Sequence, residues 1–166
     1  MPVTKIIDYL RKEHCIPTLE GSTREEVIEE LANQFVSSGA LGEDERDMLL
    51  ETVFDREAAA TTGIGNGVAL PHPKSVQDVG FLDTVLIGVG LCSAGVDFRA
   101  LDNGPVNTVF LVASPDNVEY LEVAKRIAAL AKAGSREDMW RRVIRQSTTP
   151  EALREALQDA WEELAP

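Results

Sequence analysis

Histidine and cysteine are scarce in this sequence, which has only two of each among its 166 residues. Cys15 and Cys92 lie far apart and form no CxxC pair, so the sequence lacks a metal-type cysteine motif. A metal site built from His14, His72 and both cysteines is conceivable, but no ligand spacing supports it, and we expect no metal ion. So few cysteines are typical of a reducing compartment, and we expect a cytoplasmic protein with both thiols in its packing.

Long hydrophobic runs are absent as well. The first residues, MPVTKIIDYLRKEH, lack the apolar segment of a signal peptide, and no later run is long enough to cross a bilayer. Positive charge is limited, with 16 Lys and Arg against 28 Asp and Glu, and the formal net charge is −12. This acidic balance argues against nucleic acid and anionic membranes as partners. An anion site would therefore need particular arginines, lysines or backbone N–H groups.

What remains is the composition of an ordinary globular protein, with 44% hydrophobic and 27% charged residues. A chain of this length can bury a substantial core. Because no repeat, low-complexity segment or linker interrupts it, we expect one domain over residues 1–166.

Apolar residues at helical spacing predict several helices. Ser22 suits the N-cap of one of them, because Glu25 follows three positions later as in a capping box, and Gly39 suits its end. Thr149 suits the N-cap of the last helix, with Pro150 at its first position. The expected helices lie at residues 3–10, 22–39, 43–60 and 117–132, after Ser135, and at 150–164. In the helix at 117–132 we expect these residues to face inward: Val118, Leu121, Ala124, Ile127, Ala128 and Ala131.

Short apolar runs rich in β-branched residues predict strands at residues 68–70, 83–92, 96–98 and 106–113. Gly88 and Gly90 leave one face of the second strand open to close approach by a helix or backbone. Residues 14–19 are expected to be extended, with His14 at the surface. Strands that alternate with helices favour an α/β fold, a mixed β-sheet flanked by helices on both faces in a three-layer sandwich.

The chain is organised around residues 55–75, DREAAATTGIGNGVALPHPKS. Three closely spaced glycines permit close backbone approaches, and the two prolines around His72 hold it in an extended conformation. Such stiffness suits a histidine that presents one ring nitrogen to a partner, although an ordinary loop-to-strand connection would read the same way. Arg56 falls near a helix end, where the helix dipole or a pair with Asp55 or Glu57 would also explain it.

This block resembles the fructose/mannitol-type enzyme IIA domain of the bacterial sugar phosphotransferase system. Within that family the sequence is most similar to the stand-alone, nitrogen-regulatory members. The similarity rests on Arg56-Glu57 and on the run from Thr62 to His72, TGIGNGVALPH. Weaker echoes follow at residues 97–98, 101–106, 110–115 and 121–131, so the resemblance covers nearly the whole chain.

The resemblance implies a phosphohistidine carrier that needs no metal or nucleotide cofactor. His72 would accept a phosphoryl group from the histidine-containing phosphocarrier protein and pass it, or the signal it represents, to a downstream protein. Arg56 matches the family's active-site arginine, whose fork can bind two phosphoryl oxygens. Backbone N–H groups near Thr62, Gly63, Gly65, Asn66 and Gly67 would add an anion-binding nest. Lys74 would either assist or remain a solvated surface lysine.

Two positions depart from the family pattern. Where many members have a second histidine before the first core leucine of the late helix, this sequence has Tyr120. Its hydroxyl can donate a hydrogen bond to phosphate but cannot act as an imidazole base at neutral pH. The residue after the phosphorylated histidine is usually small and flexible, and here it is Pro73.

The function that the resemblance favours is a regulatory phosphoryl relay that acts through protein contact. A sugar-transport component of the fructose/mannitol class is the alternative within the same class. A binding module that keeps the fold without transfer chemistry, suggested by Tyr120, is the alternative outside it. A purely structural protein would explain the core pattern but not the histidine between two prolines.

Overall fold

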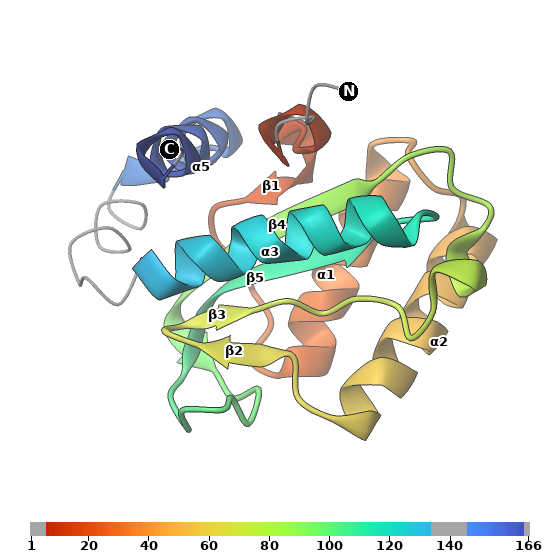
Figure 1. The fold of residues 1–166 in the computed structure, drawn as a ribbon, viewed down its shortest axis with the longest axis horizontal. Helices are drawn as coiled ribbons and strands as arrows, with labels where there is room; N and C mark the ends of the chain where they lie inside the picture. Colours follow the sequence, from red (N-terminus) through yellow and green to blue (C-terminus); the bar gives the residue numbers. More distant parts are fainter. Residues whose placement is uncertain (1–5, 134–145, 165–166) are drawn as a thin grey trace.

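Strands β4 (Leu86–Val96) and β5 (Val106–Ala113) form the centre of the sheet in the computed structural model, which describes residues 6–133 and 146–164 (Figure 1). They pair antiparallel, with Ile87 opposite Val112 and Val89 opposite Phe110. Nearly every residue of both strands up to Cys92 and from Val106 is apolar and buried. Such continuous apolar runs are typical of strands that are covered on both faces.

Shorter strands extend the sheet on either side, in the order β1-β4-β5-β3-β2. β1 (Cys15–Ile16) runs parallel to β4, and β3 (Val68–Ala69) runs parallel to β5. β2 (Gly63–Gly65) pairs antiparallel with β3. The mixed sheet predicted from the sequence is confirmed.

Helices cover both faces of this sheet (Figure 1). On one face α3 (Asn117–Ala133) and α5 (Pro150–Leu164) pack with η1 (Ile6–Tyr9) against alternate residues of β4 and β5. On the other face α1 (Arg24–Ser37) and α2 (Glu43–Ala59) bury the remaining residues of these strands. The three-layer arrangement is therefore as predicted. Two short 3-10 helices, η2 (Lys12–His14) and η3 (Val76–Val79), complete the described elements.

The two glycines of β4 allow α1 and the segment before it to lie directly on the sheet. A Cβ added at Gly88 would meet the Phe35 ring at 3.2 Å, and one added at Gly90 would meet Leu19 at 2.6 Å. Since contacts under 3.0 Å force something to move, a side chain at position 90 would displace Leu19. The close approach predicted for this face is confirmed.

The helix ends follow the predicted capping chemistry with one shift. The N-cap of α1 is Thr23 rather than Ser22, because the Thr23 hydroxyl accepts the Glu26 N–H at 3.2 Å. The capping pattern therefore begins one residue later than predicted. Thr149 caps α5 as predicted, accepting the Ala152 N–H at 3.1 Å.

Several other predictions of the sequence are wrong in detail. Residues 83–92 and 96–98 were expected as two strands, but one strand, β4, runs through to Val96. In α3, Val118 and Leu121 are 69% and 56% exposed, and Ala128 is exposed as well. The inward face of α3 instead includes Val123 and Leu130. The helix predicted after Ser135 lies outside the described residues. Among the helices that the structure does describe, none is long and apolar enough to cross a membrane.

Candidate functional site

His72 lies where the chain leaves the sheet after β3, beside the carboxyl ends of the parallel strands β3 and β5. Ligands in α/β sheets commonly bind at such strand ends. Hydrogen bonds fix the chain on both sides of the histidine. The Val112 N–H of β5 donates to the Pro71 carbonyl at 3.1 Å, and the Lys74 N–H donates to the Thr52 hydroxyl of α2 at 3.0 Å.

The imidazole of His72 is held in one tautomer. Its Nδ1 lies 2.8 Å from the Leu70 carbonyl oxygen. A carbonyl oxygen only accepts hydrogen bonds, so Nδ1 carries the proton and Nε2 keeps its lone pair. The stiffness that the flanking prolines predict thus has a defined result, a neutral ring with Nε2 as its basic and nucleophilic atom.

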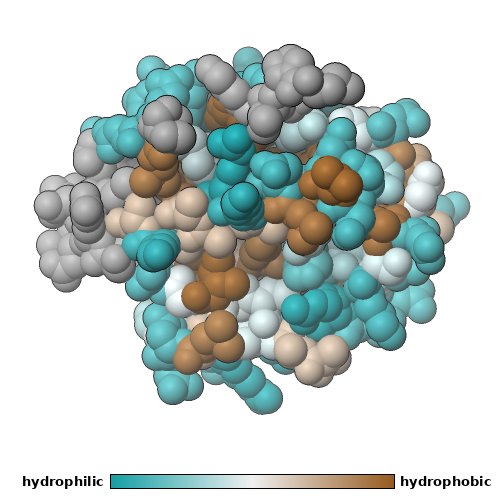
Figure 2. Space-filling model, viewed as in Figure 1, coloured by the Kyte–Doolittle hydropathy of each residue, from teal (hydrophilic) through white to brown (hydrophobic). Residues whose placement is uncertain are grey.

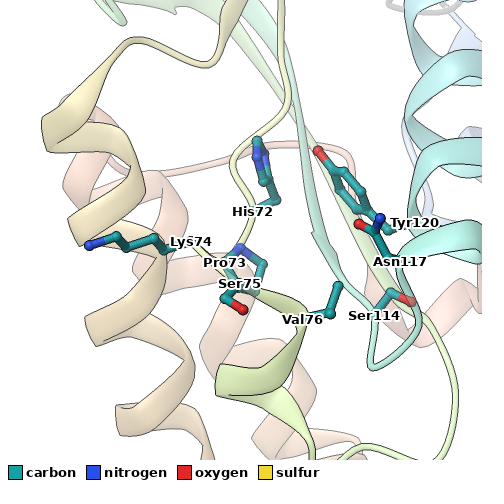
Figure 3. Close-up of a pocket in the computed structure, with 8 residues that line it drawn as sticks. All are labelled: His72, Pro73, Lys74, Ser75, Val76, Ser114, Asn117 and Tyr120. Carbon is teal, nitrogen blue, oxygen red and sulfur yellow. The ribbon is translucent and has the colours of Figure 1, made fainter.

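A cavity of about 260 Å³ opens beside this ring (Figure 3). It is lined by His72, Pro73, Lys74, Ser75, Val76, Ser114, Asn117 and Tyr120. Tyr120, in the first turn of α3, packs its phenol against the imidazole with ring centroids 5.0 Å apart. The residues that sequence reasoning missed here are Ser75, Val76, Ser114 and Asn117. For Ser114 and Asn117 the signal in the sequence is the run of turn and capping residues before α3, and for Ser75 and Val76 it is their place just after the histidine, where Ser75 caps η3.

Arg56 lies near the C-terminal end of α2, and its Nη1 donates to the Ala60 carbonyl at 2.8 Å. This contact is the helix-end role that the sequence left open. The guanidinium is also near enough to the site to affect both of its rings. Burial lowers the pKa of His72 and Arg56 lowers it further, whereas the Leu70 hydrogen bond and the Glu57 carboxylate raise it. The pKa of Tyr120 is raised by burial and lowered by Arg56.

The structure brings only part of the predicted anion-binding nest near His72. Thr62 belongs to this region, because its carbonyl accepts the Leu70 N–H at 2.9 Å. Gly63, the next residue along the chain, packs instead against Ala100 and Phe98 of the loop after β4. The Thr62 hydroxyl and N–H are turned toward Glu57, a buried carboxylate of α2.

Gly65 ends β2, and Asn66 and Gly67 form the turn from β2 to β3, away from the histidine. The Asn66 side chain donates to the Ala131 carbonyl near the end of α3, whereas Tyr120 lies in the first turn of that helix. Eleven residues of helix correspond to about 16 Å. Gly65, Asn66 and Gly67 all have positive φ, between 56° and 98°, which fits a tight hairpin turn. These residues therefore do not join the cavity at His72.

Lys74 and Pro73 both line the cavity, Lys74 from an exposed position and Pro73 from a buried one. The part of the chain that the structure describes contains no group of three or more His, Cys, Asp or Glu that could hold a metal ion. His14, which was expected at the surface, is fully buried, with Nε2 2.8 Å from the Ser38 hydroxyl. The four-residue metal set that the sequence left conceivable is thus not assembled.

The fold and the site together define an α/β sandwich with a half-buried histidine, of fixed tautomer, at the strand ends. The family model described as "Phosphoenolpyruvate-dependent sugar phosphotransferase system, EIIA 2" matches residues 8–160. This chain therefore belongs to that EIIA family, as the resemblance of residues 56–72 indicated.

Individual relatives are of two kinds. The chain is 32% identical over 141 residues to a nitrogen regulatory protein of Pseudomonas aeruginosa, covering 84% of this chain and 85% of the relative. It is 31% identical over 128 residues to the fructose-specific EIIABC component of Bacillus subtilis, covering 76% of this chain but 19% of that longer protein.

Solved structures share the fold. The crystal structure of nitrogen regulatory protein IIA-Ntr from Neisseria meningitidis aligns with a TM-score of 0.71 at 24% identity, covering 92% of this chain and 98% of that one. The mannitol IIA structure from Escherichia coli aligns with a TM-score of 0.70 at 23% identity, covering 89% and 98%.

Proposed function

We propose that this protein is a phosphohistidine carrier of the phosphoenolpyruvate-dependent phosphotransferase system and acts mainly as a regulator. It accepts a phosphoryl group on Nε2 of His72 from the histidine-containing phosphocarrier protein. The single observation that carries this proposal is the hydrogen bond from Nδ1 to the Leu70 carbonyl, which leaves Nε2 unprotonated. Family membership supports the same reaction class.

The chemistry needs only the imidazole and its surroundings. The Nε2 lone pair forms the new N–P bond while the P–N bond of the donor breaks, and its electron pair returns to the donor imidazole. His72 becomes positively charged as this happens, because Nδ1 keeps its proton. The Leu70 carbonyl accepts that N–H, so it stabilises the cationic ring electrostatically.

Two side chains are assigned to the phosphoryl oxygens. In transit the phosphoryl group spreads negative charge over its oxygens, which positioned donors stabilise. Arg56 supplies the cationic fork, and Tyr120 supplies a phenol hydroxyl, which is protonated at neutral pH and whose pKa burial raises further. The electrostatic effect of Arg56 on both His72 and Tyr120 supports this arrangement. Lys74 also lines the cavity, but its side chain points away from His72 (Figure 3), so it is given no contact with the phosphoryl oxygens.

The test is to incubate the protein with phosphoenolpyruvate, enzyme I and the phosphocarrier protein, and to read the intact mass. We expect one acid-labile phosphoryl adduct in the wild type and none in His72→Ala. His14→Phe is the matched control, because it removes the other histidine, whose ring is buried away from the cavity. An adduct that survives His72→Ala, or no adduct in a folded wild type, would contradict the proposal.

No adduct in a folded wild type would indicate a binding module that has lost transfer chemistry rather than a carrier. A binding measurement also separates these two. Such a module would bind its partner equally well as wild type and as His72→Glu, which adds a negative charge at the site. A regulator should bind one of these two forms at least about tenfold more tightly, a difference of about 1.4 kcal/mol.

A sugar-transport component is the second candidate, favoured by the 31% identity to the fructose-specific EIIABC component. The two candidates differ in the acceptor. A transport component should pass its phosphoryl group to a sugar-specific IIB domain within the time of one assay, as read by loss of the adduct mass. A regulator should retain the adduct in the presence of fructose- and mannitol-type IIB domains.

Either kind of relay must dock another protein over His72. The exposed side chains of Val118 and Leu121 lie on α3 on both sides of Tyr120 in sequence. Figure 2 shows hydrophobic side chains in brown over the region of α3, among hydrophilic neighbours. Apolar side chains at a polar rim are typical of protein-binding surfaces, which supports a protein as the partner.

A further inference from the structure

Glu57 is a buried carboxylate beside the site that the relay chemistry does not use. It is only 5% exposed and belongs to the last turn of α2. Its carboxylate accepts two hydrogen bonds from Thr62, one from the N–H at 2.8 Å and one from the hydroxyl. Arg24 of α1 approaches it at 4.0 Å. Burying a carboxylate is costly unless hydrogen bonds and a counter-ion compensate, and Glu57 has both.

Three hydrogen bonds lead from this carboxylate to the imidazole. Thr62 is fixed by Glu57, and the Thr62 carbonyl accepts the Leu70 N–H at 2.9 Å. The Leu70 carbonyl in turn accepts from Nδ1 of His72 at 2.8 Å. The peptide groups of residues 62 and 70 therefore transmit the position of the carboxylate to the ring.

The neighbouring residue fixes the other side of the same loop. Arg56 donates to the Ala60 carbonyl at 2.8 Å, while Glu57 accepts from the Thr62 N–H. Arg56 and Glu57, consecutive residues at the end of α2, thus bind the Ala60 carbonyl and the Thr62 N–H. With both contacts in place, the chain from residue 60 to 62 has little freedom to move relative to α2.

We infer that Glu57 is a positioning residue for His72: through Thr62 and Leu70, its buried carboxylate holds the imidazole in the Nδ1–H tautomer, which leaves the lone pair on Nε2. Its effect on transfer rests on the proposed function, whereas its effect on the ring does not. Arg24 serves as the counter-ion, which extends the support of the site to the first residue of α1.

The test uses ring ¹⁵N chemical shifts of the unphosphorylated protein. With only two histidines in the chain, His14 provides an internal reference. We expect His72 of the wild type to be almost entirely in the Nδ1–H form. In Glu57→Ala the ring should exchange between both tautomers, and phosphorylation should slow by about tenfold or more, as loss of one oriented hydrogen bond to a charged ring predicts.

Glu57→Gln is the conservative variant. Its amide oxygen can still accept the Thr62 N–H, and the Thr62 hydroxyl can rotate to accept from the amide nitrogen. We expect Glu57→Gln to restore most of the Nδ1–H tautomer and of the transfer rate. Glu25→Ala is the matched control, because Glu25 is an exposed carboxylate that also pairs with Arg24, at 3.1 Å, but does not touch Thr62.

A folded Glu57→Ala with the wild-type tautomer and rate would overturn the inference, as would an equal change in Glu25→Ala. If Glu57→Ala does not fold, amide exchange of the wild type decides. Thr62 and Leu70 N–H groups should then exchange more than about a hundredfold slower than in an unfolded chain, and unprotected amides would overturn the inference. If Glu57→Ala shifts the tautomer of His72 but the wild type accepts no phosphoryl group, the proposed relay is refuted and this inference stands.

Discussion

The imidazole of His72 lies against the phenol of Tyr120, with ring centroids 5.0 Å apart and planes tilted by 36°. Aromatic rings at this separation attract one another, which orients both side chains. The site therefore consists of a nucleophilic ring and a hydroxyl-bearing ring rather than two imidazoles. A phenol is protonated at neutral pH, and burial raises the pKa of Tyr120 further, so its hydroxyl can donate a hydrogen bond and does not serve as a base.

Tyr120→Phe should therefore keep the ring packing and lose the donor. We expect phosphorylation of His72 to slow by about tenfold or more, since hydrogen bonds to charged groups contribute about 1.5–3 kcal/mol. The measurement is the initial rate of mass increase, with the melting temperature as a check on folding. An unchanged rate in a folded Tyr120→Phe would assign the tyrosine to packing alone.

Arg56→Gln tests the second oxygen-binding group through the histidine itself. The guanidinium lowers the pKa of His72, so its removal should raise that pKa, as read from ring shifts across a pH series. Transfer should slow as well, because the charged fork is lost. Loss of the Ala60 contact should destabilise the protein by less than about 1 kcal/mol, as for other cations at helix ends. A pKa that stays constant or falls would show that Arg56 is too far away to act.

The sequence predicted the positions of some residues of this site but not of others. His72 and Arg56 stand in a dense local pattern, and their positions follow from strand, helix and proline rules that act over a few residues. The nest at Gly65 to Gly67 was predicted from the same block, but left-handed backbone there makes a hairpin turn away from His72. A glycine pattern indicates that the backbone adopts a left-handed conformation there. It does not indicate in which direction the backbone N–H groups point.

The fold shows the same limit. Element types and the sheet centre were predictable because apolar periodicity and capping are local. The inward face of α3 was misassigned at Val118 and Leu121. Apolar residues at helical spacing can also lie on an exposed protein-binding surface, as proposed for these two. His14 was placed at the surface because the residues around it are polar. Its burial depends on Ser38 and Phe35, which are more than twenty residues away in sequence.

The buried His14 makes stability depend on pH. The Ser38 hydroxyl donates to the Phe35 carbonyl at 3.1 Å, so it accepts from Nε2–H of His14, and Nδ1 has no hydrogen-bond partner among the residues that the structure describes. Burial, with a smaller effect from Arg11, lowers the pKa of His14 to about 4 from 6.5. The folded state therefore binds the proton less readily than the unfolded state. The contribution of the neutral His14 to the stability of the fold is complete above pH 6.5 and is lost as the pH falls toward 4.

Between pH 7 and pH 5 we expect His14 to cost about 2 kcal/mol in the free energy of unfolding, measured by urea denaturation. His14→Phe should remove most of this dependence. It leaves the Ser38 hydroxyl with its own acceptor and keeps an aromatic ring against Phe35. The same pH dependence in His14→Phe as in the wild type would assign the effect to other groups.

Gly63→Ala tests the packing that supports Thr62. An added Cβ would lie 2.8 Å from the Cβ of Ala100 and 2.9 Å from its Cα. Relief of these contacts would require the backbone at Gly63 or at Ala100 to shift. We expect a loss of about 1–3 kcal/mol in stability, as for other overpacked sites. Gly80→Ala is the control, because its added Cβ would meet nothing closer than 3.5 Å and its φ is −61°. Equal stability of the two variants would contradict the close approach.

The central claim is that Nε2 of His72 accepts the phosphoryl group while Nδ1 stays bonded to Leu70. The most direct measurement is ¹⁵N and ³¹P NMR of the histidine-labelled protein after phosphorylation. We predict phosphorus bonded to Nε2 of His72, with Nδ1 still protonated and its proton protected from exchange. Phosphorus on Nδ1, or on any residue other than His72, would contradict the account.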